Sequence, residues 1–283
     1  MTVSEPLRLR LGYSPCPNDT FIFYALAHGL ARDGGAPELA FDIVLDDVEA
    51  LNQAADRETL DVAKVSYHAY GYLADRFVML RAGGALGRGV GPLIVTKEPL
   101  ADLAGRRIAI PGGRTTANLL LALSQPDAEL VTLRYDRIMP AVAAGEVDAG
   151  LIIHESRFTY RDHGLECFLD LGTWWEETTG LLVPLGGIVA RRDLGPELLQ
   201  RLQATLRSSL AYAWENPLAT RDYVGCHAQE MDATVRQRHI ELYVNRYSMD
   251  VTDDGERAAV AMLARAAEAG LFPPVPEPFF LPE

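Results

Sequence analysis

The sequence predicts an α/β protein of two lobes, each a mostly parallel sheet flanked by helices, with a ligand cleft between them. Three observations favour this fold. Strand-like and helical segments alternate over residues 7–191, which is typical of βαβ units. The order strand, loop, helix, strand, helix, strand occurs twice, once on each side of a glycine-rich segment at 82–92. The 283 residues are enough for one large or two medium domains.

The first lobe opens with alternating apolar and basic residues at 7–12, which predict a strand. The loop at 13–20 contains two prolines and ends in a helix cap, so a nearly wholly apolar helix is expected at 20–28. The next expected elements are a strand at 40–45, a helix capped by Asp46 or Asp47, a strand at 61–66 and a helix at 67–73.

The second lobe follows residues 82–92, where five of eleven residues are glycine. This segment is too rich in glycine for a helix or a strand interior, so a hinge is expected there. The expected elements are strands at 93–97, 107–110, 130–135, 148–153 and 165–171, helices at 117–124, from Asp136 to 144 and at 172–179, and a return crossing at 181–191.

The last third of the chain is mainly helical, and its tail at 272–283 carries five prolines, so the tail is expected to lie extended on the surface. We assign residues 1–92 and 192–283 to lobe one and 93–191 to lobe two, with crossings near 91–97 and 183–191. The helices are expected at 196–215, 218–229, 234–247 and 254–269, with Asn216 and either Asp253 or Asp254 as caps.

The composition limits the partners of the chain. It has 26 basic and 39 acidic residues and a net charge of −13, which makes nucleic acid and anionic membranes poor partners. No apolar run is long enough to span a bilayer, and residues 1–11 lack a signal-peptide pattern, so we expect a cytoplasmic protein. Three widely spaced cysteines fit a reducing compartment and neither a disulfide framework nor a zinc site.

Two predicted loops have the features of anion sites. Motifs for nucleotide cradling, serine hydrolysis and zinc proteolysis are absent from the sequence. The segments 18–20 and 113–116 each open a helix after a strand, where free N–H groups and the helix dipole favour a carboxylate or phosphate. Helix capping needs the same residue types, so either loop alone could be only a cap. Ligands of such sheets bind beyond the carboxyl ends of the strands, which places both loops at the cleft.

Single side chains at strand ends are the other candidates. Lys64 and Ser66 share one face of a strand, and a buried lysine is unfavourable unless it is paired or reaches a site. Alternatively, the Lys64 tip reaches solvent. His154 follows a strand and can accept a proton at neutral pH, although a strand-end histidine can also be purely structural. The residues that could orient His154 or bind a ligand are Glu155, Arg157 and Tyr160.

The motif segments resemble the 1,4-dihydroxy-6-naphthoate synthase family of the futalosine branch of menaquinone biosynthesis. They are the segments 14–21, 64–67, 84–92, 148–155, 157–160, 174–175 and 184–187. The resemblance implies a type II periplasmic-binding-protein fold and conversion of cyclic dehypoxanthinylfutalosine to 1,4-dihydroxy-6-naphthoate, without metal or organic cofactor. It places the general base on His154. It also implies carboxylate and hydroxyl contacts from Asn52, Ser66 and Thr115 or Thr116.

We therefore expect a small carboxylate substrate, a monomer or homodimer, and no cofactor. Proton removal by His154, retro-aldol-type cleavage and aromatisation form the expected mechanism. The alternatives are chorismate dehydratase of the same pathway, a non-catalytic small-anion solute-binding protein, and a ligand-sensing domain, for which no basic helix-turn-helix segment precedes residue 7. The candidate substrate-binding residues are Asn18, Asp19, Thr20, Asn52, Lys64, Ser66, Thr115, Thr116, Glu155, Arg157 and Tyr160.

Overall fold

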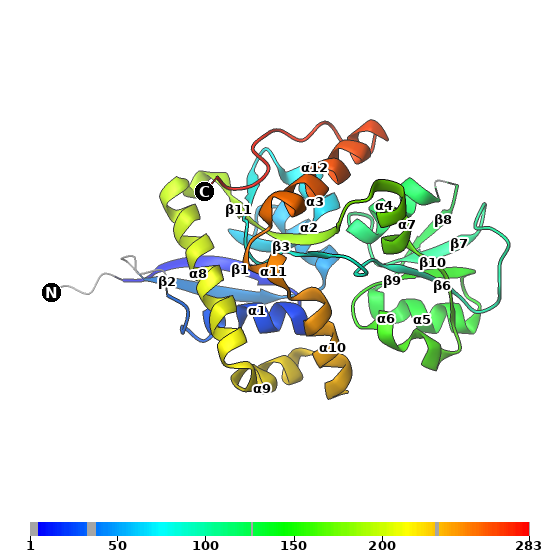
Figure 1. The fold of residues 1–283 in the computed structure, drawn as a ribbon, viewed down its shortest axis with the longest axis horizontal. Helices are drawn as coiled ribbons and strands as arrows, with labels where there is room; N and C mark the ends of the chain where they lie inside the picture. The colour runs from blue at the N-terminus through cyan, green and yellow to red at the C-terminus, as the bar shows by residue number, and fades with distance from the viewer. Residues whose placement is uncertain (1–4, 33–37, 126, 230–231, 283) are drawn as a thin grey trace.

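A computed structural model describes residues 5–32, 38–125, 127–229 and 232–282. Two lobes lie side by side, one around β1, β2 and β3 and the other around β6 to β10 (Figure 1). The predicted α/β class with two lobes is confirmed.

The first sheet has the strand order β2-β1-β3-β11-β4, and β5 also pairs with β11. β1 is parallel to β2 and β3, whereas β11 is antiparallel to β3, β4 and β5. The whole of β3 is buried, including its polar residues Lys64 and Ser66. The strands are β1 Leu7–Tyr13, β2 Leu39–Leu45, β3 Val62–Ser66, β4 Phe77–Met79, β5 Ala85–Gly87 and β11 Val183–Arg191.

The second sheet has the order β10-β6-β9-β7-β8. β7 is parallel to β8 and β9, whereas β6 is antiparallel to β9 and β10. Both sheets are therefore mixed rather than mostly parallel, because β6 and β11, which lie in the two crossing segments, are antiparallel to their neighbours. The strands are β6 Leu93–Thr96, β7 Arg107–Ile110, β8 Glu129–Thr132, β9 Ala149–Ile152 and β10 Glu166–Asp170.

The crossings differ from expectation in one respect. β11 lies in the segment 183–191, which we placed at the end of lobe two, yet it hydrogen-bonds into the first sheet. The other boundaries of the two lobes stay predictions. The first crossing packs tightly: a Cβ on Gly91 would lie 2.2 Å from the Gly172 backbone, so only glycine fits there.

Helices cover both sheets. α1 packs on α8, α9 and α10, and α12 packs on β11 and α3. The helices are α1 Pro17–Ala27, α2 Val48–Asp56, α3 Tyr67–Leu73, α4 Thr116–Ser124, α5 Tyr135–Ala144, α6 Ser156–Thr159, α7 Leu171–Thr179, α8 Pro196–Glu215, α9 Pro217–His227, α10 Ala233–Tyr243, α11 Arg246–Met249 and α12 Thr252–Glu268, with 3-10 turns at Tyr160–His163 and Arg192–Leu194.

Several helix starts correct the sequence prediction. α1 begins at Pro17, so Asn18, Asp19 and Thr20 form its first turn rather than the loop before it. Asp47, not Asp46, caps α2 by accepting two backbone N–H groups. Asp136 lies in the first turn of α5, two residues after the N-cap residue Arg134. Asn216 precedes α9 without a side-chain cap.

The C-terminal region also differs. The helix expected at 234–247 is broken into α10 and α11, because Asn245 caps a new helix. Val251 is the N-cap position of α12, so Asp253 and Asp254 lie in its first turn. The glycine-rich segment contains the short strand β5, which we expected not to form.

The tail is non-helical, as predicted, but it is not simply a surface segment. Phe272, Phe280 and Leu281 are buried, and Phe280 forms a parallel bridge with Met79 of β4. The apolar residues of the tail thus complete the core beside β4.

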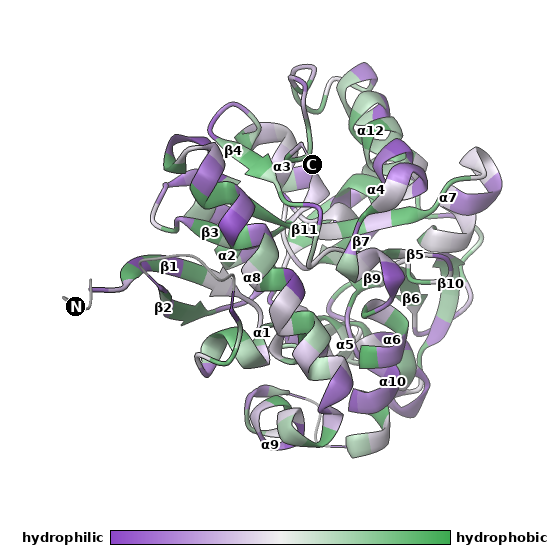
Figure 2. Cartoon of the chain, turned by 60° about the vertical axis from the view of Figure 1, so that its left-hand side comes forward, coloured by the Kyte–Doolittle hydropathy of each residue, from purple (hydrophilic) through white to green (hydrophobic). Residues whose placement is uncertain are grey.

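One apolar cluster runs through both lobes, from Leu51 and Val65 to Ile108 and Leu119. The strands are largely hydrophobic and α10 is mostly hydrophilic (Figure 2). None of the helices in the described ranges is both long and apolar enough to cross a membrane.

Candidate functional site

A pocket with about 720 Å³ of empty space, part of it open to solvent, lies between the lobes. β3, the first turns of α1 and α4, the segment after β9 and the helix α10 all contribute to it. Eight predicted site residues line the pocket: Asn18, Asp19, Lys64, Ser66, Thr115, Thr116, His154 and Arg157.

The structure does not place the other four predicted residues in the lining. Thr20 donates to the carbonyl oxygens of Cys16 and Pro17 within its own helix. Asn52 accepts from the Ser66 N–H at 3.0 Å and donates to the Arg114 carbonyl, so it supports two walls of the pocket. Tyr160 packs in the core below the second sheet. The last of the four is Glu155, which is buried behind the lining.

Lys64 is paired rather than exposed. Its Nζ lies 3.1 Å from Asp19 Oδ1 and donates to the Gly83 carbonyl at 2.8 Å. Asp19 Oδ2 accepts from the Ser14 hydroxyl at 2.7 Å. The Lys64 and Asp19 side chains are only 7% and 3% exposed, so each charge requires the other. This corrects the alternative in which Lys64 reaches solvent.

The N-terminus of α4 faces the pocket. The Thr115 hydroxyl accepts from the Asn118 N–H and donates to the Gly112 carbonyl, so it acts as a helix cap. The Thr116 hydroxyl donates to the Leu185 carbonyl at 2.6 Å. Both hydroxyls are engaged, and the anion-attracting feature here is the helix end itself, whose first N–H groups have no partner in the helix. Ser66 differs, because its hydroxyl makes no capping hydrogen bond.

His154 has an unusual backbone conformation and lines the pocket. It follows β9 after Ile153, and its φ of +57° lies in the left-handed region. For a residue other than glycine this costs about 1–3 kcal/mol, and such strain is concentrated at functional sites. Its ring packs edge-on against Tyr135 at 5.4 Å. Burial lowers the pKa of His154, although the nearby Glu155 and Asp19 carboxylates act in the opposite direction. His154 is therefore unprotonated at neutral pH.

Sequence reasoning missed two polar residues of the lining, His239 and Tyr243, whereas Ser14 belongs to the loop expected at the cleft. His239 and Tyr243 are four residues apart on α10 and share one face of that helix. The ring of His239 lies 6.3 Å from that of His154, nearly parallel to it. Burial lowers the pKa of His239 as well. The spacing indicates a shared face but not which cleft that face meets.

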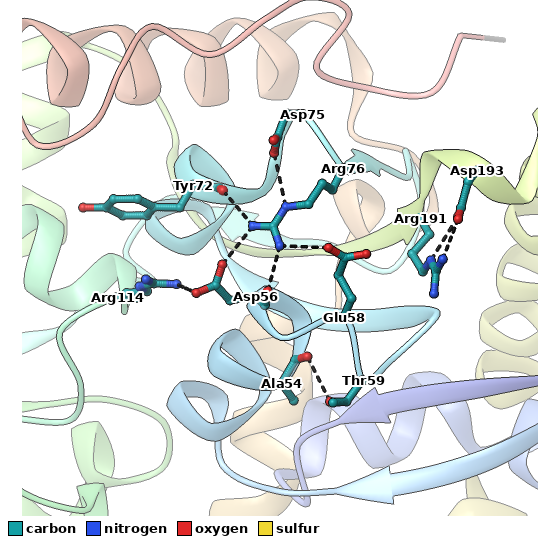
Figure 3. Close-up of polar contacts among 10 residues, drawn as sticks. All are labelled: Ala54, Asp56, Glu58, Thr59, Tyr72, Asp75, Arg76, Arg114, Arg191 and Asp193. Atoms are coloured by element: carbon teal, nitrogen blue, oxygen red, sulfur yellow. Dashed lines mark hydrogen bonds and ion pairs between the residues drawn. The ribbon is translucent and has the colours of Figure 1, made fainter.

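One contact between the lobes lies at the edge of a polar cluster of the first lobe (Figure 3). The Arg114 guanidinium, from the second lobe, lies 2.6 Å from Asp56 of α2. Its backbone N–H donates to Glu49, also on α2. Asp56 is shared with Arg76, whose hydrogen bond is the main reason that the pKa of this carboxyl is lowered. We call the Arg114–Asp56 contact the interlobe ion pair.

In the described part of the chain, no three histidine, cysteine or carboxylate side chains are grouped so as to hold a metal ion. The arrangement is instead one for acid–base chemistry on an anion: a helix N-terminus, a buried ion pair and a neutral histidine around one pocket.

Two mixed α/β lobes around a pocket define the class of periplasmic-binding-protein folds. The alkanesulfonate-binding protein of Xanthomonas axonopodis pv. citri superposes with a TM-score of 0.74 at 18% identity, covering 98% of this chain and 99% of that one, which concerns the fold alone. The family model described as menaquinone biosynthesis matches residues 9–268, and the chain belongs to this family.

Relatives agree with this membership. The chain is 53% identical over 273 residues to a 1,4-dihydroxy-6-naphtoate synthase of Thermus thermophilus, covering 96% of this chain and 99% of the relative. It is 50% identical over 271 residues to the enzyme of that name from Streptomyces coelicolor, covering 94% and 95%. A crystal structure of an Archaeoglobus fulgidus protein superposes with a TM-score of 0.88 at 39% identity, covering 94% and 98%.

Proposed function

We propose that the protein is a cytoplasmic 1,4-dihydroxy-6-naphthoate synthase, a carbon–carbon lyase that acts on cyclic dehypoxanthinylfutalosine in menaquinone biosynthesis. The observation that carries the proposal is a neutral, backbone-strained His154 in an interlobe pocket of a chain whose relatives bear this name. The enzyme needs no cofactor and acts as a monomer or homodimer.

The pocket suits a substrate with a carboxylate, hydroxyl groups and a ring system. The N-terminus of α4 attracts the carboxylate locally, so the net charge of −13 is no obstacle. The Ser66 hydroxyl remains available to the substrate, since it makes no capping bond. Val90, Pro92 and Leu185 supply apolar walls for the ring.

His154 acts as the general base. It removes a proton from the substrate, a retro-aldol-type step cleaves the carbon–carbon bond, and aromatisation of the product drives the reaction. A neutral imidazole is the form that can accept the proton, and burial maintains that form. Contact between the lobes excludes water from the charged intermediate.

Turnover of purified protein with cyclic dehypoxanthinylfutalosine tests the proposal, with the absorbance and fluorescence of the naphthoate as readout. His154→Asn should lower kcat by at least about a hundredfold, because proton transfer by a positioned base contributes that much or more. His163→Asn, at an exposed histidine of the same lobe, is the matched control and should leave kcat unchanged.

The other outcomes would contradict the role of His154 or favour a different function. Wild-type kcat in a folded His154→Asn variant would contradict the role of His154. Tight ligand binding without turnover would favour a solute-binding protein. Turnover of chorismate alone would favour the dehydratase of the same pathway.

A further inference from the structure

The side chain of His154 is held by ring packing rather than by a hydrogen bond. A catalytic base is commonly oriented by a hydrogen bond to a third group. In the described part of the chain, neither imidazole nitrogen of His154 hydrogen-bonds to another residue. Its φ of +57° is also unfavourable, and such a conformation persists only where the surrounding structure holds it. The residues that pack against the imidazole must therefore determine its orientation.

Two rings contact the imidazole. The Tyr135 ring lies at a centroid distance of 5.4 Å with the two planes at 73°, an edge-to-face arrangement. The His239 ring lies at 6.3 Å and is nearly parallel. Tyr135 is the first residue of α5, which packs on β9, the strand that leads to His154. His239 instead lies on α10, which packs on α1 of the first lobe. Of the two rings, Tyr135 is the one that belongs to the same lobe as His154.

The ring of Tyr135, and not its hydroxyl, makes this contact. The hydroxyl oxygen is buried and has no hydrogen-bond partner among the described residues, and burial raises the pKa of the phenol far above neutral pH. We propose that Tyr135 is a positioning residue for the reaction, whose ring fixes the orientation of the His154 imidazole and shields one side of it from water. This inference rests on the proposed function for the role of His154.

The shielding has a consequence for the protonation of His154. Burial is the main reason that the pKa of this imidazole is lowered. A smaller side chain at position 135 would let water approach the imidazole, so the pKa of His154 would rise toward about 6.5. Substitutions at this position leave the other groups that act on the imidazole in place, namely Asp19, Asp47, Lys64, Glu155 and His239.

Nuclear magnetic resonance of the full chain tests the contact without turnover. The imidazole C–H signals of His154, one of six histidines, are assigned by their loss in His154→Asn, and their titration gives the pKa. Tyr135→Leu should raise that pKa, whereas Tyr135→Phe keeps the ring and should leave it at the wild-type value. Val142→Ala, which removes core contacts two turns further along α5, is the control and should also leave it unchanged.

Two outcomes of the titration would overturn the proposal. One is an unchanged His154 pKa in folded Tyr135→Leu. The other is an equal rise in Tyr135→Leu and Val142→Ala, which would show a general loosening of α5. If Tyr135→Leu does not fold, Tyr135→Met replaces it, because the flexible methionine side chain fills irregular space but supplies no ring.

Kinetics test the effect on the reaction. Tyr135→Leu should lower kcat at least about tenfold and leave KM within about twofold, because a misplaced base slows the chemical step while the pocket lining is retained. The acid limb of its kcat/KM profile should move to higher pH together with the pKa of His154. Tyr135→Phe should have the kcat and the pH profile of wild type.

The kinetic results can also contradict the proposal. A loss of kcat in Tyr135→Phe would assign the role to the hydroxyl rather than the ring. A loss of kcat in Tyr135→Leu with an unmoved acid limb would show a merely structural role. Absence of turnover in wild type would contradict the proposed function instead, and the titration of His154 would then decide whether Tyr135 shields the imidazole.

Discussion

The environment of His154 has a measurable consequence in the pH dependence of activity. Burial lowers the pKa of this side chain, and the base must be unprotonated to act. We expect the acid limb of the kcat/KM profile to have its midpoint below about 6.5, the ordinary value for histidine. Activity should thus be retained as the pH falls through 6.5 and lost at lower pH. A midpoint at or above that value would exclude His154 as the titrating base.

His68 should make the fold sensitive to acid. It is buried, its Nδ1 donates to the Thr115 carbonyl, and burial lowers its pKa to about 4. The unfolded chain binds the proton near pH 6.5 whereas the folded one does not, so stability falls as the pH drops from 6.5 toward 4.

His68→Asn keeps a donor near the Nδ1 position and removes the titration. Between pH 7 and pH 5 wild type should lose about 2 kcal/mol more unfolding free energy than this variant. Urea denaturation at the two pH values measures the difference. Equal losses in the two proteins would show that His68 does not cause the acid sensitivity.

At the scale of single elements, the N-cap of α2 should make a measurable contribution to the free energy of unfolding. Asp47 Oδ1 accepts from the N–H groups of Glu49 and Ala50. Asp47→Ala should lower the unfolding free energy by about 1 kcal/mol, and Asp47→Ser should restore most of it. Asp46→Ala is the control, because Asp46 accepts from the Asp47 N–H, which precedes the helix, and caps none of the described N–H groups of α2. Denaturant melts that show equal losses at both positions would contradict the assignment of the cap.

The sequence predicted correctly those helices and strands whose bounds depend on residues within the segment itself. The observed bounds of α3, β7 and α8 coincide with the predicted ones, because apolar periodicity and flanking breakers lie within each segment. β4 and β5 were not predicted, since three residues carry little pattern and both form by pairing with the remote β11. The break between α10 and α11 depends on Asn245, which also donates to the Leu86 carbonyl in β5.

The candidate site divides in the same way. Lys64, Ser66, Thr115 and His154 lie at strand ends or helix caps, where the sequence places polar side chains at the cleft. His239 lies on α10, which packs against α1 through long-range contacts. The spacing of residues within α10 does not indicate that packing. The sequence could not predict the pairing of Lys64 with Asp19 either, because α1 begins three residues earlier than its apolar pattern indicates.

At the scale of the whole molecule, the interlobe ion pair links closure to substrate binding. Arg114 and Asp56 are each about one-third exposed, so their contribution to stability is at most about 1 kcal/mol. Arg114→Gln should raise KM several-fold with little change in kcat or in the unfolding free energy, because it favours separation of the lobes.

Added salt should raise KM in wild type and have less effect in Arg114→Gln, since salt screens a partly exposed pair. Arg8→Gln removes a similar pair with Asp42 at the first sheet, away from the pocket, and should leave KM unchanged. The same increase in KM for both variants would show a general effect of surface charge.

The order of strands along the chain determines when each sheet can form during synthesis. All strands of the second sheet lie between Leu93 and Asp170, so that sheet is complete once this stretch has emerged. β3 and β4 lie in the first sheet, yet β11, the strand between them, is made only afterwards, and Phe280 joins β4 later still. A nascent chain therefore carries open strand edges while its second half is translated. Open strand edges can pair with other chains, so the nascent chain is most prone to aggregation during this part of synthesis. A ribosome-bound chaperone would protect it most effectively at that stage.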